Sequence, residues 1–181
     1  FALATGTVDN GRCQVDRAHV LGTGDVTLVI GNGDRAWVAV VDPRAPGVEP
    51  LNGRTVIDPS RPLRAYRLTG TPCLDHRAVE REEALAAGRI CVAADLLGTA
   101  AGALDAAVAH VLQRTQFGQP IGAFQAVKHQ LADAYVAVER ARSLTYGAAL
   151  NPVPSNTTLL ANASAAEAAV RVASRYTQLM G

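Results

Sequence analysis

A chain of 181 residues, of which 49% are hydrophobic, is long enough for one or two compact domains and too apolar to be disordered. A formal net charge of +1 provides no general field to attract nucleic acid or an anionic membrane, so an anion has to be bound by a local basic group. Cys13, Cys73 and Cys91 are far apart and lack metal-ligand spacing, and their odd number argues against a disulfide framework. These features predict a cytoplasmic protein without nucleic-acid or membrane partners.

The ends of the sequence bear on targeting. The chain opens at Phe1 rather than methionine and shows no signal-peptide pattern. Its longest apolar stretch is interrupted by Asp95 and by glycines, which predicts no membrane-spanning segment. Helical character persists up to Gly181. We therefore expect the sequence to be part of a longer polypeptide.

Residues 1–76 have the pattern of a small antiparallel β-domain, either a barrel or a sandwich. The β-branched run at 26–30 and the apolar run at 36–41 flank a glycine-rich turn, which predicts a hairpin. A loop punctuated by prolines follows at 42–48. Further short strands are predicted at residues 12–15, 55–58 and 63–68.

From about residue 77 the hydrophobic spacing changes to three and four, which predicts helices. A first long helix leads to Arg114, a second runs from Phe124 to Leu150, and a third covers about 157–179 after the proline-containing stop at 152–154. The fold class is therefore α+β, with a β-domain at 1–76 followed by an up-down helical bundle at 77–181. The face expected to be buried on the third helix carries Leu160, Ala163, Ala166, Val170, Ala173 and Thr177.

Common catalytic and metal motifs are missing from the sequence. The four histidines are scattered, so no metal site is predicted, and neither a nucleophile elbow nor a phosphate-binding glycine loop followed by a helix occurs. The turn between the first two helices is different, because it presents Arg114 beside an aromatic ring and a glycine. Such a turn suits a phosphate-bearing ligand, but an arginine that caps the preceding helix explains it equally well.

The residues of this turn also carry a resemblance to a known family. Arg114 is followed by Phe117-Gly118, Pro120-Ile121 and Phe124-Gln125 before the second helix, and the whole of 114–133 resembles the signature of the acyl-CoA dehydrogenase family. The resemblance extends back to Arg89 and forward to Gln178. It implies a middle β-domain and most of a C-terminal four-helix domain, without the family's N-terminal helical domain.

The resemblance also implies roles for individual residues. The equivalent of Arg114 contacts the pyrophosphate of FAD bound mainly by a neighbouring subunit, and the equivalent of Phe117 packs near that cofactor. The equivalents of Gln125 and Gln178 reach the adenosine side, and Arg89 matches an arginine near the acyl-CoA site. The implied reaction is α,β-dehydrogenation of an acyl-CoA thioester, in fatty acid or steroid side-chain degradation, with electrons passed on to an electron-transfer acceptor.

Two departures from the family pattern qualify this assignment. Gly88 occupies one family position of the catalytic glutamate, and the other lies beyond Gly181, so no catalytic residue is assigned. Trp37 lies on the wrong strand for the family's flavin-covering tryptophan motif. The chain thus resembles the degenerate subunit of heterotetrameric bacterial members, a dimer of dimers, although a homo-oligomer is also open. The alternatives are an assembly subunit without flavin and, on the same scaffold, a flavin-dependent monooxygenase or acyl-CoA oxidase.

Overall fold

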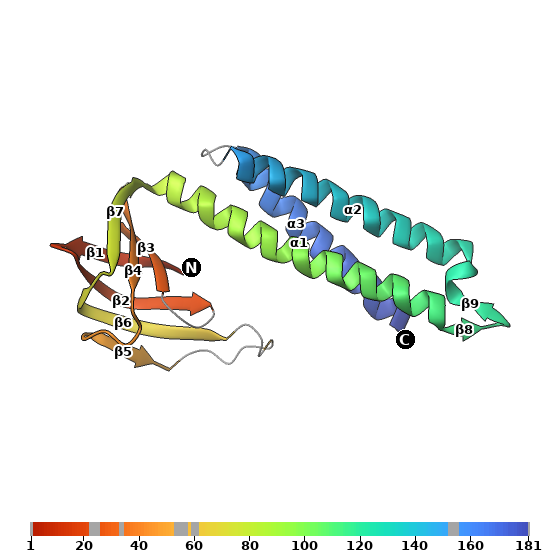
Figure 1. Cartoon of the computed structure of the whole chain (residues 1–181), viewed down its shortest axis with the longest axis horizontal. Helices are drawn as coiled ribbons and strands as arrows, with labels where there is room; N and C mark the ends of the chain where they lie inside the picture. The colour runs from red at the N-terminus through yellow and green to blue at the C-terminus, as the bar shows by residue number, and fades with distance from the viewer. Residues whose placement is uncertain are drawn as a thin grey trace. The chain divides into compact units, whose positions relative to one another are not determined.

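The computed structural model describes residues 2–21, 26–32, 35–52, 58, 62–151 and 156–180. It consists of two compact units, a β unit at Phe1–Ala84 and a helical unit at Leu85–Gly181 (Figure 1). The predicted α+β class is confirmed.

The described residues of the β unit form a seven-stranded sheet with the order β5-β6-β2-β1-β3-β4-β7. All neighbours are antiparallel except β1 and β3, which pair in parallel. The sheet is therefore mixed, whereas a purely antiparallel one was expected. The reason is that the chain reverses before and after β2, so β3 runs in the direction of β1 and pairs with the edge that β2 leaves open. The strands are β1 (Ala2–Asp9), β2 (Arg12–Leu21), β3 (Val26–Asn32), β4 (Arg35–Val41), β5 (Val48–Leu51), β6 (Leu63–Pro72) and β7 (Asp75–Glu80).

The predicted hairpin is confirmed by the β3–β4 register, in which Val26 lies opposite Val41 and Ile30 opposite Trp37. The strands predicted from residues 12 and 63 are also present, and both are longer than expected. Of the strand predicted at 55–58, residues 55–57 lie outside the described residues.

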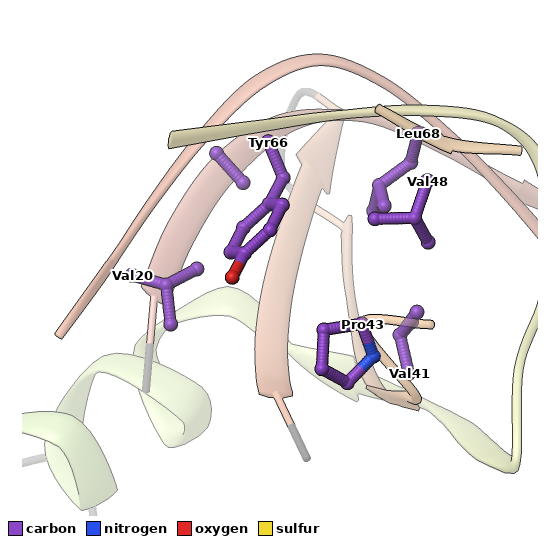
Figure 2. A pocket seen from close by; sticks show the side chains of 7 residues that line it. Val20, Val41, Pro43, Val48, Tyr66 and Leu68 are labelled. Atoms are coloured by element: carbon purple, nitrogen blue, oxygen red, sulfur yellow. The ribbon is translucent and has the colours of Figure 1, made fainter. Parts of the chain in front are cut away.

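The core of the β unit consists of side chains that alternate along the strands, including the fully buried Val15, Ile30 and Val41. A small apolar cavity of about 10 Å³ remains in it, with the ring of Tyr66 pointing inward (Figure 2). This volume holds about one water molecule, so the cavity is no site for an organic ligand. It is lined by Ala18, Val20, Val41, Pro43, Val48, Tyr66 and Leu68.

In the helical unit, the described residues form α1 (Arg81–Gln113), α2 (Gln125–Leu150) and α3 (Asn156–Met180). The first turn of α1 still belongs to the β unit, where Ala84 packs against Ala36. Alanine dominates the bundle core, which allows α2 and α3 to approach closely. The amide of Asn162 in α3 donates a hydrogen bond of 3.3 Å to the Arg89 carbonyl in α1. The core residues are Ala93, Leu97, Ala100, Leu104, Ala134, Ala137, Val138, Ala141, Ala148, Ala161, Ala165, Ala168, Ala169 and Val172.

The predicted buried face of α3 is wrong. Leu160 and Val170 are 57% and 70% exposed, and Ala163, Ala173 and Thr177 are exposed as well. The helix carries alanine on most sides, so a spacing of three and four fits more than one face. Closely packed helices favour the face with the smallest side chains. That face carries Thr158, Ala161, Ser164, Ala165, Ala168, Ala169 and Val172.

The expectation that no segment is long enough to span a membrane also needs correction. Helix α1 has the length and the mean hydropathy of a membrane span. An alanine-rich helix in the middle of a bundle gives the same signal, and Ala93, Leu97 and Leu104 of α1 lie in the bundle core. Packing in the bundle accounts for part of the hydropathy of α1, since 28% of its apolar stretch is buried.

Candidate functional site

The connection between α1 and α2 is a short β-hairpin rather than an irregular turn. Strand β8 (Thr115–Gln116) pairs antiparallel with β9 (Gln119–Pro120). The two residues between them, Phe117 and Gly118, have φ angles of +52° and +78°. Two positive φ angles in a two-residue loop are typical of a type I′ turn. Glycine adopts this conformation without cost, whereas a bulky residue such as phenylalanine pays about 1–2 kcal/mol.

Backbone contacts hold this hairpin on the end of α1. The N–H of Arg114 donates to the His110 carbonyl at 2.9 Å, and the N–H of Ile121 donates to the Arg114 carbonyl at 2.8 Å. The 3₁₀ turn η1 (Ile121–Ala123) follows. A Cβ at Gly122 would lie 3.1 Å from the Val111 carbonyl oxygen, so a residue without a side chain suits this close approach to α1. The position of Arg114 is therefore fixed at both of its backbone polar groups.

The side chain of Arg114 is exposed. Within the described residues its guanidinium has no hydrogen-bond or ion-pair partner, so it does not cap the carbonyls at the end of α1 as the alternative interpretation required. An exposed guanidinium presents donors in a planar fork that matches the oxygens of a phosphate. The geometry of Arg114 is thus compatible with an anion ligand.

An aromatic ring stands beside this guanidinium in sequence and is open to solvent. Phe117 is 90% exposed, and its ring meets the ring of Phe124 edge to face, with centroids 6.1 Å apart. So much apolar surface in water is unfavourable unless something covers it. The exposed ring and its strained backbone together indicate a contact surface.

Helix α2 begins next to the hairpin with Gln125. Its N-cap residue, Phe124, makes no side-chain cap, and the Phe124 carbonyl accepts the N–H groups of Val127 and Lys128, both at 3.1 Å. The exposed amide of Gln125 lies 3.4 Å from Nε2 of His129. The uncapped N-terminus adds a partial positive charge to the surroundings of the hairpin.

The other two predicted site residues lie at different places in the helical unit. The C-terminal end of α3, which carries Gln178, lies at the same end of the bundle as the hairpin (Figure 1), and Gln178 Oε1 accepts a 3.2 Å hydrogen bond from Arg175. Arg89 lies near the opposite end, since the helix between Arg89 and Arg114 rises by roughly 35 Å. The structure thus groups Arg114, Phe117 and Gln125 and separates them from Arg89.

His110 is a residue near this end that the sequence did not point to. It lies in the last turn of α1, and its Nε2 is buried without a hydrogen-bond partner among the described residues. Buried polar atoms normally have a partner, so this nitrogen is an acceptor or donor still to be satisfied. Its isolated place in the sequence, without spacing to another polar group, carried no signal of this.

The residue types at the hairpin fit a dinucleotide such as FAD. A guanidinium suits a pyrophosphate, an exposed ring suits the flat surfaces of a cofactor, and an amide suits the polar edge of a nucleotide. The described residues hold no group of three or more side chains that could bind a metal ion.

A catalytic carboxylate is missing from the family position in α1. Gly88 is buried in the helix, and the nearest acidic residues, Glu82 and Glu83, lie in its exposed first turn. Glu83 pairs with Arg77 at 3.5 Å. Trp37 lies on β4, with its ring centroid 6.0 Å from that of His76. The described structure therefore places no carboxylate at Gly88.

Comparisons with known proteins agree on one family. Residues 79–181 match the family described as acyl-CoA dehydrogenase, C-terminal domain. The chain is 41% identical over 92 residues to acyl-CoA dehydrogenase IpdE2 of Mycolicibacterium smegmatis, and the aligned region covers 51% of this chain and 29% of the relative. It is 35% identical over 179 residues to acyl-CoA dehydrogenase FadE34 of Mycobacterium tuberculosis, and the aligned region covers 92% of this chain and 24% of the relative.

The fold comparison leads to the same group of proteins. The solved Tcur3481-Tcur3483 steroid ACAD G363A variant superimposes with a TM-score of 0.74 at 27% identity, over 99% of this chain and 51% of that chain. The chain thus spans about half the length of this solved relative, and the matches to the two curated relatives cover less than a third of each.

Proposed function

Since the chain belongs to the acyl-CoA dehydrogenase family, we propose that it serves in the FAD-dependent α,β-dehydrogenation of an acyl-CoA thioester. The observation that carries the proposal is the hairpin, which carries a 90% exposed ring three residues after an exposed guanidinium without a partner among the described residues. Members of this family generally use FAD, and the residue types of the hairpin fit its nucleotide part.

In the proposed mechanism, the residues of this chain hold and orient the cofactor. The Arg114 guanidinium binds the pyrophosphate, Phe117 covers the cofactor against water, and Gln125 and Gln178 bind the adenosine side. When bound, FAD supplies the chemistry of accepting a hydride from the β-carbon of the substrate. The proton on the α-carbon needs a carboxylate base, which we propose comes from outside the described residues, because Gly88 offers none.

The proposed substrate is an acyl-CoA, with Arg89 as a contact for it. The relative described as a steroid ACAD supports a bulky acyl group. The small residues Gly98 and Gly102 on α1 are consistent with a roomy surface, because a Cβ at either position would meet nothing within 4 Å. A fatty acyl chain remains the alternative substrate, and a comparison of turnover with straight-chain and polycyclic acyl-CoA esters distinguishes the two.

The proposed assembly is a tetramer of acyl-CoA dehydrogenase subunits, in which the hairpin meets a flavin held mainly by a neighbouring subunit. The solved relative is described by a pair of protein names, which supports a hetero-oligomer. The reduced cofactor then passes its electrons to an electron-transfer acceptor. We propose the cytoplasm as its location. The proposed reaction involves neither nucleic acid nor a membrane.

A second candidate is an assembly subunit without flavin. Exposed apolar side chains on α2 and α3 favour it, among them Val136 at 65%, Leu160 at 57% and Val170 at 70%. Such residues are typical of surfaces that pack against another chain. In that case the hairpin is only a connection between two helices.

An Arg114→Ala substitution in the full-length protein, purified with its partner subunits, separates the two candidates. The cofactor role predicts a fall in bound flavin of at least about tenfold at unchanged oligomeric state, because a charge-assisted pair to phosphate is lost. The measurement is the ratio of flavin to protein absorbance after gel filtration.

Arg171→Ala is the matched control, because Arg171 on α3 makes an exposed ion pair with Glu167 at 2.9 Å. Removing a surface ion pair of this kind should leave flavin content unchanged. If Arg114→Ala retains as much flavin as this control, the assembly role is favoured and the cofactor role of the hairpin is rejected.

A further inference from the structure

Two of the three cysteines lie in contact inside the β unit. Cys13 lies on β2 and Cys73 directly follows β6, 60 residues later in the chain, yet their Sγ atoms are 2.8 Å apart. The two thiols share a hydrogen bond. Cys91 is exposed on α1, in the helical unit.

The backbone places the two cysteines next to each other. In the β2–β6 register, Cys13 lies opposite Thr71, and residues two apart on an extended segment share a face of the sheet. The N–H of Cys73 donates to the Gly11 carbonyl at 2.8 Å, which continues the pairing by one step. Cys73 is therefore the diagonal neighbour of Cys13 on the same face.

Two side-chain contacts fasten the same stretch of strands. The guanidinium of Arg12 donates to the Gly70 carbonyl at 2.7 Å, and the Gly70 N–H donates to the Gln14 side chain at 3.2 Å. The cysteine pair thus sits in a part of the sheet where side-chain hydrogen bonds also join β2 to β6.

We propose that Cys13 and Cys73 form a reversible redox pair, which closes to an intramolecular disulfide by exchange with a small-molecule disulfide such as oxidised glutathione. This inference goes beyond the proposed function and does not depend on flavin or acyl-CoA binding.

The two sulfurs differ in their environment, which sets the order of the steps. Cys13 is fully buried, whereas Cys73 is partly exposed. Burial, as the largest cause, raises the pKa of the Cys13 thiol to about 12 together with the hydrogen bond to Cys73 and the charge of that group. Cys13 therefore stays protonated and out of reach of solvent, so Cys73 is the sulfur that meets the oxidant.

The exchange is balanced in atoms and electrons. The Cys73 thiolate attacks one sulfur of glutathione disulfide, the glutathione S–S bond breaks, and one glutathione thiolate leaves and takes up a proton. The Cys13 sulfur then attacks the Cys73 sulfur, the bond between Cys73 and glutathione breaks, and the proton of the Cys13 thiol passes to the second glutathione as it leaves as a thiol. Two protein thiols are oxidised by two electrons in total, and one glutathione disulfide is reduced to two thiols.

The test uses the purified full-length protein, reduced, freed of reductant and then incubated with excess oxidised glutathione under native conditions. Remaining thiols are alkylated, and the protein is digested without reduction for mass spectrometry. We expect a peptide pair that links Cys13 to Cys73, and both of these cysteines should be protected from alkylation, whatever happens at the exposed Cys91. Added dithiothreitol should restore both thiols.

Three variants sharpen the result. Cys91→Ser is the matched control and should form the linked peptide to the same extent as the wild type. Cys13→Ala should trap glutathione on Cys73, and Cys73→Ser should leave Cys13 unmodified because it is buried. Cys13→Ala changes the core and can fail to fold. In that case the Cys73→Ser variant and the wild-type peptide map are sufficient to test the proposal.

A second readout is thermal unfolding. A bond that closes a loop of 60 residues restricts the unfolded chain, so oxidation should raise the unfolding midpoint by roughly a few degrees in the wild type and in Cys91→Ser, but not in Cys73→Ser. The proposal is overturned if glutathione attaches to Cys73 or Cys91 without any linked peptide. It is equally overturned if the linked peptide forms only in denaturant.

Discussion

Two tight turns of the same kind occur in the two units of the molecule, and they are occupied by different residues. Asn10 and Gly11, between β1 and β2, have φ angles of +48° and +71°, and Phe117 and Gly118, between β8 and β9, have +52° and +78°. Asn-Gly is the residue pair that a type I′ turn favours. Phenylalanine in the first position is unfavourable, so the turn itself does not explain the presence of Phe117.

The two turns also differ in the length and the exposure of the strands that they join. The turn at Asn10 joins long strands in the middle of the sheet, where β1 and β2 pair from Asp9 opposite Arg12 to Gly6 opposite Val15. The turn at Phe117 joins strands of two residues whose side chains are all exposed. The first turn therefore supports the pairing of long strands, whereas the second presents an exposed side chain.

The largest expected effect comes from the glycine of the first turn. Gly11→Ala places a Cβ at a φ of +71°, which costs about 1–2 kcal/mol, although the space itself is sufficient with His76 at 3.5 Å. The free energy of unfolding of the full-length protein in urea should fall by that amount, because the β1–β2 pairing depends on the turn.

Gly118→Ala is the matched comparison, since its φ is +78° and a Cβ there meets nothing within 4 Å. We expect a smaller loss of global stability, because the β8–β9 hairpin opens locally without unfolding the bundle. Equal losses in the two variants would contradict the distinction between a turn that supports folding and a turn that presents a side chain.

Secondary structure that depends on residues close together in the sequence was predicted, whereas structure that depends on distant residues was not. The β3–β4 hairpin is local, with β-branched residues on both sides of a glycine-rich turn, and it was predicted. Strand β7 carries Asp75, His76 and Arg77 and was missed, because only its pairing with β4 makes it a strand. The buried face of α3 was wrong since alanine fits either side of a helix.

The range of the interactions also decided which sites could be predicted from the sequence. Arg114, Phe117 and Gln125 lie within a dozen residues of each other, so one motif in the sequence brought them to attention. The contact between Cys13 and Cys73 was not predicted, because it requires β6 to be the neighbour of β2, and nothing in the local sequence sets that order. The buried Nε2 of His110 likewise depends on packing rather than on sequence spacing.

A substitution of Asn10 by phenylalanine tests whether phenylalanine is also unfavourable in the first turn. Asn10→Phe creates in the β unit the residue pair that the second turn has naturally. We expect a loss of about 1 kcal/mol in the free energy of unfolding, because asparagine tolerates a positive φ better than phenylalanine does. Asn10→Gly is the control and should change stability by only a few tenths of a kcal/mol. An unchanged stability in Asn10→Phe would mean that the turn places no demand on this position.

The smallest change in stability, and the most informative one, is expected for Phe117→Asn. Relief of the backbone strain should stabilise the full-length protein by up to about 1 kcal/mol, while the bound flavin should decrease because its aromatic cover is lost. Phe117→Tyr is the control, because it keeps both the ring and the strain, and it should retain stability and flavin alike. A gain in stability together with a loss of flavin would establish that an unfavourable residue is kept in this turn for the sake of the ligand. A gain in stability with flavin unchanged would contradict a role for the ring in cofactor binding, and Arg114 would then have to hold the cofactor without it.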